Sequence, residues 1–175
     1  YKARLSDFDD SKASLLGDFL PTKLGMDPGE GFVWACVTAD YSGHLLFFFE
    51  NGKVARVALS AYQTQTRRKK LTGAYSDKSP LAAACLLTED TEMAVTSTEG
   101  RVVVFHTAAL TPKTTRSTQG VNVMTLKPKY KVADARPLAD TTIVNAARYR
   151  ARSLPIAGML LRPEDRAEEQ MTLLE

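Results

Sequence analysis

The chain has 175 residues, of which 44% are hydrophobic and 25% charged, a composition typical of a globular protein and not of a disordered one. No apolar run approaches the roughly 18 residues of a membrane-spanning helix, and the N-terminal residues lack the apolar core of a signal peptide. Cys36 and Cys85 lie inside apolar runs, which favours buried thiols over a disulfide framework and predicts a cytoplasmic location.

The net charge of +3 is unevenly distributed along the chain. Residues 1–30 carry 4 basic and 6 acidic side chains, and residues 163–175 carry 1 basic and 5 acidic ones. The 18 basic and 9 acidic side chains that remain lie in residues 31–162. A basic body with an acidic tail indicates an anionic partner, and the tail can compete with that partner for the same surface.

The first thirty residues begin in the middle of a repeated pattern. "YKARLSDF" resembles the later segment "GKVARVALSAY", which places Arg4 over Arg56 and Phe8 over Tyr62. We therefore expect residues 1–30 to form half a repeat unit that starts in its third strand.

The first complete unit is predicted over residues 31–76. Short apolar runs predict strands at Val33–Thr38, Leu45–Phe49 and Lys53–Val57, and a fourth strand at Lys69–Tyr75. Asn51-Gly52 separates the second and third runs, and this dipeptide favours the positive backbone dihedrals of a two-residue hairpin turn.

The second unit, residues 80–132, repeats this order with a period of about 48 residues. Strands are expected at Ala82–Leu87, Glu92–Ser97, Arg101–Phe105 and Val121–Leu126, with Gly100 in the position of Gly52. Four short strands at a period of 40 to 50 residues are typical of propeller blades.

These observations predict an all-β fold, a β-propeller-like array of four-stranded blades. Residues 133–162 read as a degenerate blade, so that 1–162 form one repeat domain followed by the acidic tail 163–175. A closed propeller has typically 4–8 blades, so an array of about three is expected to be partial or open.

Basic residues recur in the loop that follows the third strand of each unit. Loops at equivalent positions emerge on the same side of successive repeats, so the charges are expected to form a stripe that fits the phosphates of duplex DNA. The predicted phosphate ligands are Arg67, Arg68, Lys69, Lys70, Lys113, Arg116, Lys127, Lys129 and Lys131, with Lys53, Arg56 and Arg101 as weaker candidates because strand positions can face a neighbouring unit.

Four segments together resemble the C-terminal domain of the A subunit of bacterial type IIA topoisomerases, DNA gyrase and topoisomerase IV. They are "LLFFFENGKVARVALSAY", "TEMAVTSTEGRVVVFHTAAL", "TTRSTQGVNVMTL", in which Gln119-Gly120 opens the last strand of a blade, and the inter-blade passage "FLPTKLGMDPGEGFVWACV". The resemblance covers roughly residues 1–132.

The resemblance implies a propeller of hairpin-exchanging blades that binds and bends duplex DNA around its rim and presents a segment for strand passage. It implies a nucleoid-associated location and, as partners, the A-subunit core and the B subunit of an ATP-hydrolysing enzyme. The nucleophilic tyrosine of that family belongs to a different region. The chain also lacks the glycine-rich basic box of gyrase, because "QTQTRRKK" has charge without glycine; this favours a topoisomerase IV-like or diverged role.

No catalytic, metal or cofactor site is predicted. His44 and His106 have no companions at metal-ligand spacing, and "GMDPGEG" lacks the lysine and the helix of a phosphate-binding loop. The alternative to DNA binding is a repeat β-module for protein–protein contact, in which the basic loops serve solubility or bind an acidic protein.

Overall fold

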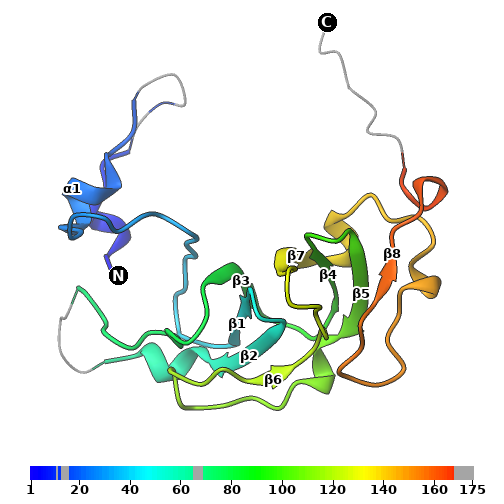
Figure 1. Cartoon of the computed structure of the whole chain (residues 1–175). Helices are drawn as coiled ribbons and strands as arrows, with labels where there is room; N and C mark the ends of the chain where they lie inside the picture. The colour runs from blue at the N-terminus through cyan, green and yellow to red at the C-terminus, as the bar shows by residue number, and fades with distance from the viewer. Residues whose placement is uncertain (11, 13–15, 65–68, 168–175) are drawn as a thin grey trace, which may run out of the picture.

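The computed structural model describes residues 1–10, 12, 16–64 and 69–167. Within these ranges, the strands form two four-stranded antiparallel sheets, and the α-helix, α1 (Leu20–Leu24), has five residues. Figure 1 shows the sheets next to each other, with α1 and the N-terminal segment to one side. The predicted all-β array of four-stranded blades is confirmed.

Each sheet is built around one hairpin. In the first, β1 (His44–Phe49) pairs with β2 (Lys53–Ala58), and in the second, β4 (Glu92–Ser97) pairs with β5 (Arg101–His106). All four strands lie within one residue of their predicted limits. The apolar runs and the glycine turns between them therefore fixed these elements locally.

The hairpin turns are one residue longer than predicted. The register pairs Phe48 with Val54, which leaves residues 50–52 as a three-residue loop, and the second hairpin has the same register around residues 98–100. Gly52 and Gly100 close these loops with φ values of 84° and 82°. A three-residue hairpin loop commonly ends in a left-handed residue, which explains the glycine at this position.

The remaining strands are exchanged between units. β3 (Leu81–Leu87), predicted to start the second unit, pairs with β1 of the first hairpin, and β7 (Val132–Pro137) pairs in the same way with β4. The strand orders are β3-β1-β2-β6 and β7-β4-β5-β8. Each hairpin is thus completed by chain that follows it in sequence.

The outer strands, β6 (Val121–Asn122) and β8 (Met159–Leu160), are short and occupy equivalent positions. β6 pairs with the start of β2, and β8 pairs with the start of β5. Each follows a glycine that lies against the hairpin: a Cβ on Gly120 would lie 1.9 Å from the Val54 carbonyl oxygen, and one on Gly158 would lie 2.6 Å from that of Val102. The segment around Gly158 therefore repeats the outer strand of the first sheet.

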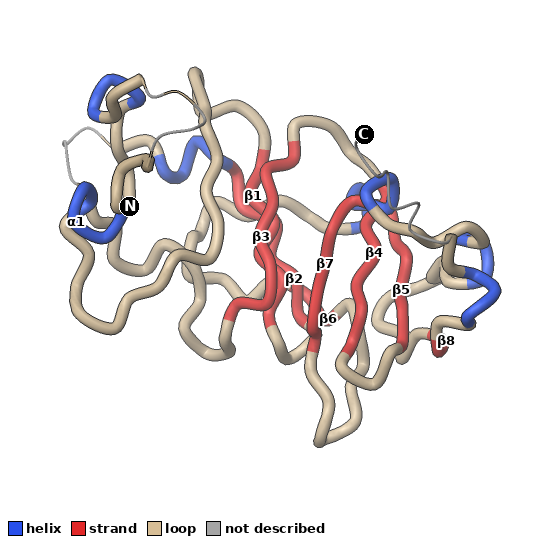
Figure 2. Tube along the Cα trace, turned by 90° about the horizontal axis from the view of Figure 1, so that it is seen from above, coloured by secondary structure: helices blue, strands red, loops and turns tan. Residues whose placement is uncertain are grey.

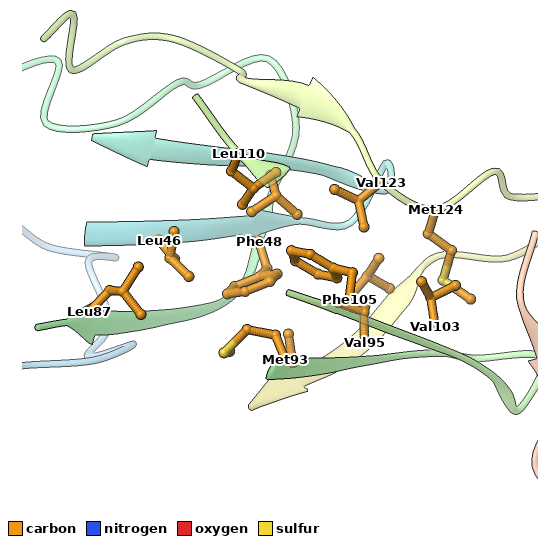
Figure 3. Close-up of a cluster of buried hydrophobic side chains, with 13 residues drawn as sticks. Leu46, Phe48, Leu87, Met93, Val95, Val103, Phe105, Leu110, Val123 and Met124 are labelled. Atoms are coloured by element: carbon orange, nitrogen blue, oxygen red, sulfur yellow. The ribbon is translucent and has the colours of Figure 1, made fainter. Parts of the chain in front are cut away.

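The largest core lies between the two sheets. Figure 3 shows Phe48 of β1 beside Phe105 of β5, with Leu46 and Val103 in the same cluster, and Phe48 and Leu46 are fully buried. Figure 2, from above, shows β3 and β7 adjacent where the sheets meet. Because side chains alternate across a strand, the opposite face of each sheet carries a second set of apolar residues.

Those opposite faces are covered by non-strand chain. Phe47 and Tyr62 belong to a core that extends to Trp34 and Leu71, whereas on the second sheet Tyr149 packs with Val102 and Val104. Both sheets are thus buried on two faces, as blades are within an array.

Three predicted strands are absent or shortened. Val33–Thr38 and Lys69–Tyr75 form no strand, and the predicted Val121–Leu126 is reduced to two residues. For Val33–Thr38 the reason is the lack of a partner: the equivalent β3 pairs with the hairpin that precedes it, and the described chain before residue 33 has no hairpin. Phe32, Val33 and Val37 are accordingly exposed.

The N-terminal segment likewise forms no strand within its described residues. It contains a 3-10 turn at Leu5–Asp7 that matches the 3-10 turn Leu59–Tyr62 after β2. The sequence likeness between the two segments therefore reflects this turn and not a third strand. The division of the chain into blades at 31–76, 80–132 and 133–162, with a tail from 163, stays a prediction.

Candidate nucleic-acid interface

Three of the predicted phosphate ligands are exposed lysines whose side chains form no ion pair with any described residue: Lys69, Lys113 and Lys129. The Lys113 backbone is anchored between Arg56 and Ala58 of β2, which fixes the base of its side chain at the edge of the first sheet. Arg67 and Arg68 lie outside the described residues.

Lys70 is held by two carboxylates of the N-terminal segment. Its Nζ donates to Glu30 Oε1 at 2.7 Å and also to Asp27 Oδ2. The hydrogen bond from Lys70, with a second from Tyr1, lowers the pKa of Glu30 to about 2, and the two carboxylates raise the pKa of Lys70. Two of the three ammonium donors of Lys70 are therefore already used, and both carboxylates repel a phosphate that approaches this lysine.

Lys127 and Lys131 are also paired, each with a glutamate of a hairpin turn. Lys127 Nζ lies 2.5 Å from Glu99 Oε1, and Lys131 Nζ lies 2.6 Å from Glu50 Oε1. Both lysines remain more than half exposed, with side-chain accessibilities of 62% and 55%. The hydrogen bond from Lys127 holds the pKa of the Glu99 carboxyl below its usual value.

Arg56 connects the two sheets. Its Nη1 donates to Asp90 Oδ1 at 2.8 Å and to the Thr107 carbonyl oxygen at 3.1 Å, and its side chain is only 10% exposed. The Thr107 hydroxyl donates to the same oxygen of Asp90, and together with Arg56 it lowers the pKa of Asp90. This geometry assigns Arg56 a structural contact between blades.

Lys53 and Arg101, which start the equivalent strands β2 and β5, both reach across to the outer strand. Lys53 Nζ donates to Gln119 Oε1 at 3.2 Å, and Arg101 Nη1 donates to the Gly158 carbonyl oxygen at 2.9 Å. Arg116, in the same outer segment as Gln119, lies with its guanidinium carbon 5.9 Å from the centre of the Tyr62 ring. These cations hold the outer segments against the hairpins.

The single stripe of cations stays a prediction, and two of its members lie far apart along the first sheet. Lys113 lies beside Val57 near the end of β2, whereas Lys131 pairs with Glu50 in the turn that precedes β2. Lys113 and Lys131 therefore lie at opposite ends of β2. The sequence did not indicate this separation, because it depends on the path of residues 113–131 in the fold. These residues run the length of the first sheet through β6.

The outer edges of the two sheets carry different kinds of side chain, polar on the first and apolar on the second. Residues 113–122 read "KTTRSTQGVN", and the equivalent residues 151–160 read "ARSLPIAGML". The second edge exposes Ile156, Met159 and Leu160, at 39%, 44% and 54%. Ala157-Gly158 in place of Gln119-Gly120 was the signal that could have identified this repeat.

Other kinds of site are not found in the described part of the chain. No group of three or more His, Cys, Asp or Glu side chains is arranged to hold a metal ion there. Within the same ranges, every helix is too short or too polar to cross a membrane.

Solved structures of other proteins share this fold. No model of a known protein family matches the sequence, and no curated protein matches it. Among solved structures, the C-terminal domain of DNA topoisomerase IV superposes with a TM-score of 0.75 at 18% identity over 93% of this chain. The C-terminal domain of DNA gyrase A gives a TM-score of 0.52 at 19% identity over 68% of the chain.

The chain spans only part of both solved domains, 56% of the topoisomerase IV domain and 43% of the gyrase domain. At these identities the likeness concerns the fold. The resemblance predicted from the hairpin and turn motifs is confirmed at this level: the chain has the blade architecture of the C-terminal domains of topoisomerase IV and DNA gyrase A.

Proposed function

We propose that this chain binds duplex DNA without sequence specificity and bends it, as the C-terminal domain of a type IIA topoisomerase A subunit. The observation that carries the proposal is the structural match to the C-terminal domain of DNA topoisomerase IV, which extends over 93% of the chain. The A-subunit core and the B subunit are the proposed protein partners, and the catalytic chemistry belongs to them.

The exposed lysines support backbone contacts with DNA. Lys69, Lys113 and Lys129 are available without exchanging an ion pair with a described residue, and Lys70, Lys127 and Lys131 add three contacts when phosphates displace their carboxylates. Exposed ion pairs are weak, so such an exchange costs little. Three to six phosphate contacts correspond to a slope of about −3 to −5 in a plot of log K against log salt concentration.

A gel shift on a linear duplex of about 150 base pairs, at several salt concentrations, tests this function. We expect salt-sensitive binding that is weakened, with a shallower slope, when Lys69, Lys113 and Lys129 are changed together to Ala. Lys12→Ala is the control, because Lys12 is an exposed lysine outside the proposed contacts. A second variant with Arg67, Arg68, Lys69 and Lys70 changed to Ala tests the four adjacent predicted ligands of the loop that follows β2.

Bending is measured separately, from energy transfer between dyes on the two ends of the duplex. Binding that brings the ends closer supports the whole proposal, and binding without this change reduces it to DNA binding alone.

Protein contact is the second candidate function, and the apolar outer edge at Ile156, Met159 and Leu160 favours it. Absence of duplex binding even at low salt selects this candidate. Binding through such an edge responds only weakly to salt, because its centre is apolar.

A further inference from the structure

The connection between β6 and β7 carries three lysines in five residues, and neighbouring glutamates occupy two of them. Lys127 pairs with Glu99 and Lys131 with Glu50, while Lys129 between them has no ion pair with a described residue. We call residues 127–131 the lysine loop and Glu50 and Glu99 its turn glutamates.

Backbone contacts place the turn glutamates against this loop. The Val132 amide donates to the Glu50 carbonyl oxygen at 2.9 Å, and the Thr98 amide donates to the Lys131 carbonyl oxygen at 2.8 Å. The Lys131 amide in turn donates to the Thr98 hydroxyl at 3.1 Å. These bonds hold the loop between the two hairpin turns whether or not its side chains are paired.

We propose that Glu50 and Glu99 compete with phosphates for Lys127 and Lys131, and so limit the affinity of the lysine loop for duplex DNA. The proposal rests on the proposed function, whose regulation it describes. A carboxylate at the ammonium group already neutralises its positive charge, and it repels a second anion at the same group, so each anion weakens the binding of the other.

The accessibilities of the two pairs fit a competition in which a phosphate displaces the turn glutamates from their lysines. Glu50 and Glu99 are mostly covered, with side-chain accessibilities of 27% and 16%, whereas their lysines are exposed by more than half. Glu99 keeps a second partner in Arg101, at 2.9 Å, after Lys127 leaves. The lysines can therefore turn outward to phosphates while the backbone bonds keep the loop in place.

The pairing itself is tested without DNA, by the rate at which a water-soluble acylating reagent modifies each lysine. The folded chain is labelled intact, and mass spectrometry of its fragments then compares the extent of labelling at Lys127 and Lys131 with that at Lys129. We expect the two paired amines to react several times more slowly than Lys129, and Glu50→Gln to raise the rate at Lys131 alone. Equal rates at all three lysines in the unmodified protein would overturn the proposal, whatever the protein does with DNA.

The competition is tested by duplex binding of Glu50→Gln and Glu99→Gln. Glutamine keeps an acceptor oxygen and removes the charge, so each variant is expected to bind about two- to fivefold more tightly at low salt, the range of an exposed ion pair. The slope against log salt concentration should steepen by about 0.9 for each lysine released. Glu50→Gln is the cleaner variant, because Glu99 also pairs with Arg101.

Glu164→Gln is the matched control. Glu164 is paired with Arg162 at 3.4 Å, outside the lysine loop, and its substitution changes the net charge by the same amount. Equal tightening in all three variants means that net charge alone is responsible, and unchanged affinity in the turn variants means that the glutamates only brace the loop. Either result overturns the proposal while salt-sensitive binding by the unmodified protein leaves the proposed function standing.

Discussion

Gly120 shows how a single residue determines the position of a strand. It has a φ of 71°, and a Cβ at this position would meet the Val54 carbonyl oxygen and the Ala55 Cα, which a Cβ cannot approach without a backbone shift. Gly100 has a similar φ of 82° but no atom within 4 Å of the position of a Cβ. A comparison of substitutions at the two glycines therefore distinguishes the cost of a left-handed backbone from the added cost of a steric clash.

We expect Gly120→Ala to destabilise the fold clearly more than Gly100→Ala. The second substitution should cost about 1–2 kcal/mol, the penalty of a left-handed backbone for a residue with a side chain. The first adds displacement of β6 from β2. Urea unfolding of both variants measures the difference, and equal midpoints would show that the outer strand moves without cost.

His44 lies at the contact between the sheets, with its Nδ1 3.4 Å from Nη2 of Arg56, and gives that contact a dependence on pH. Burial, and then the positive charge of Arg56, lowers the pKa of His44, whereas Asp90 acts in the opposite direction. The unfolded chain therefore takes up the proton first, at its ordinary pKa of about 6.5, and stability falls as the pH drops below that value.

The thermal midpoint is expected to decrease between pH 7 and pH 5.5, and His44→Gln should flatten this decrease. The carboxyl groups with lowered pKa values, such as Asp90 and Glu99, titrate at lower pH and do not obscure the result. A calorimetric scan at each pH measures the midpoints; identical decreases in both proteins would place the responsible group elsewhere.

At the scale of elements, the hairpins were predictable and their partners were not. The strands β1 and β4 are runs of mostly apolar residues, and each is followed by a turn that contains glycine. This local pattern is enough to predict a hairpin. β3 pairs with β1 in the first sheet, and β7 pairs with β4 in the second. From the middle of one strand to the middle of its partner, the separation is about 35 to 40 residues. The sequence of the later strand is compatible with pairing on either neighbouring hairpin.

The shared core predicts that the two sheets unfold together. Phe48 of the first sheet is fully buried in the same cluster as Val95 and Phe105 of the second. Phe48→Ala is expected to lower the free energy of unfolding by about 3–5 kcal/mol, the usual cost of removing a buried phenylalanine.

Circular dichroism should show one transition for both sheets in the unmodified protein, at a lower midpoint in the variant. Phe19→Ala is the control, since Phe19 is 71% exposed and its removal leaves no cavity. Two separate transitions in the unmodified protein would show that the blades are independent.

For the whole molecule, the charge distribution predicts that the acidic C-terminal residues lower the affinity for duplex DNA. Deletion from residue 163 would remove Asp165, which is buried and accepts a hydrogen bond from the Tyr149 hydroxyl at 2.5 Å. Residues 168–175 carry three of the acidic side chains and can be deleted without removing that contact.

We expect the chain that ends at residue 167 to bind duplex DNA more tightly at low salt, because three negative charges no longer compete with phosphates. The difference should disappear as salt screens the charges. Gel shifts at low and high salt measure it, and equal affinities at low salt would exclude a shielding role for these residues.

The sequence alone determined the all-β repeat, the hairpins and the glycines of their turns, because strand pattern and turn chemistry act over a few neighbouring residues. Only the tertiary structure decided which hairpin each later strand completes and which cations are free. Lys127 and Glu99 are 28 residues apart, and Lys131 and Glu50 are 81 residues apart. A basic loop read from sequence shows its charge, whereas its availability to phosphate depends on carboxylates that folding brings from distant parts of the chain.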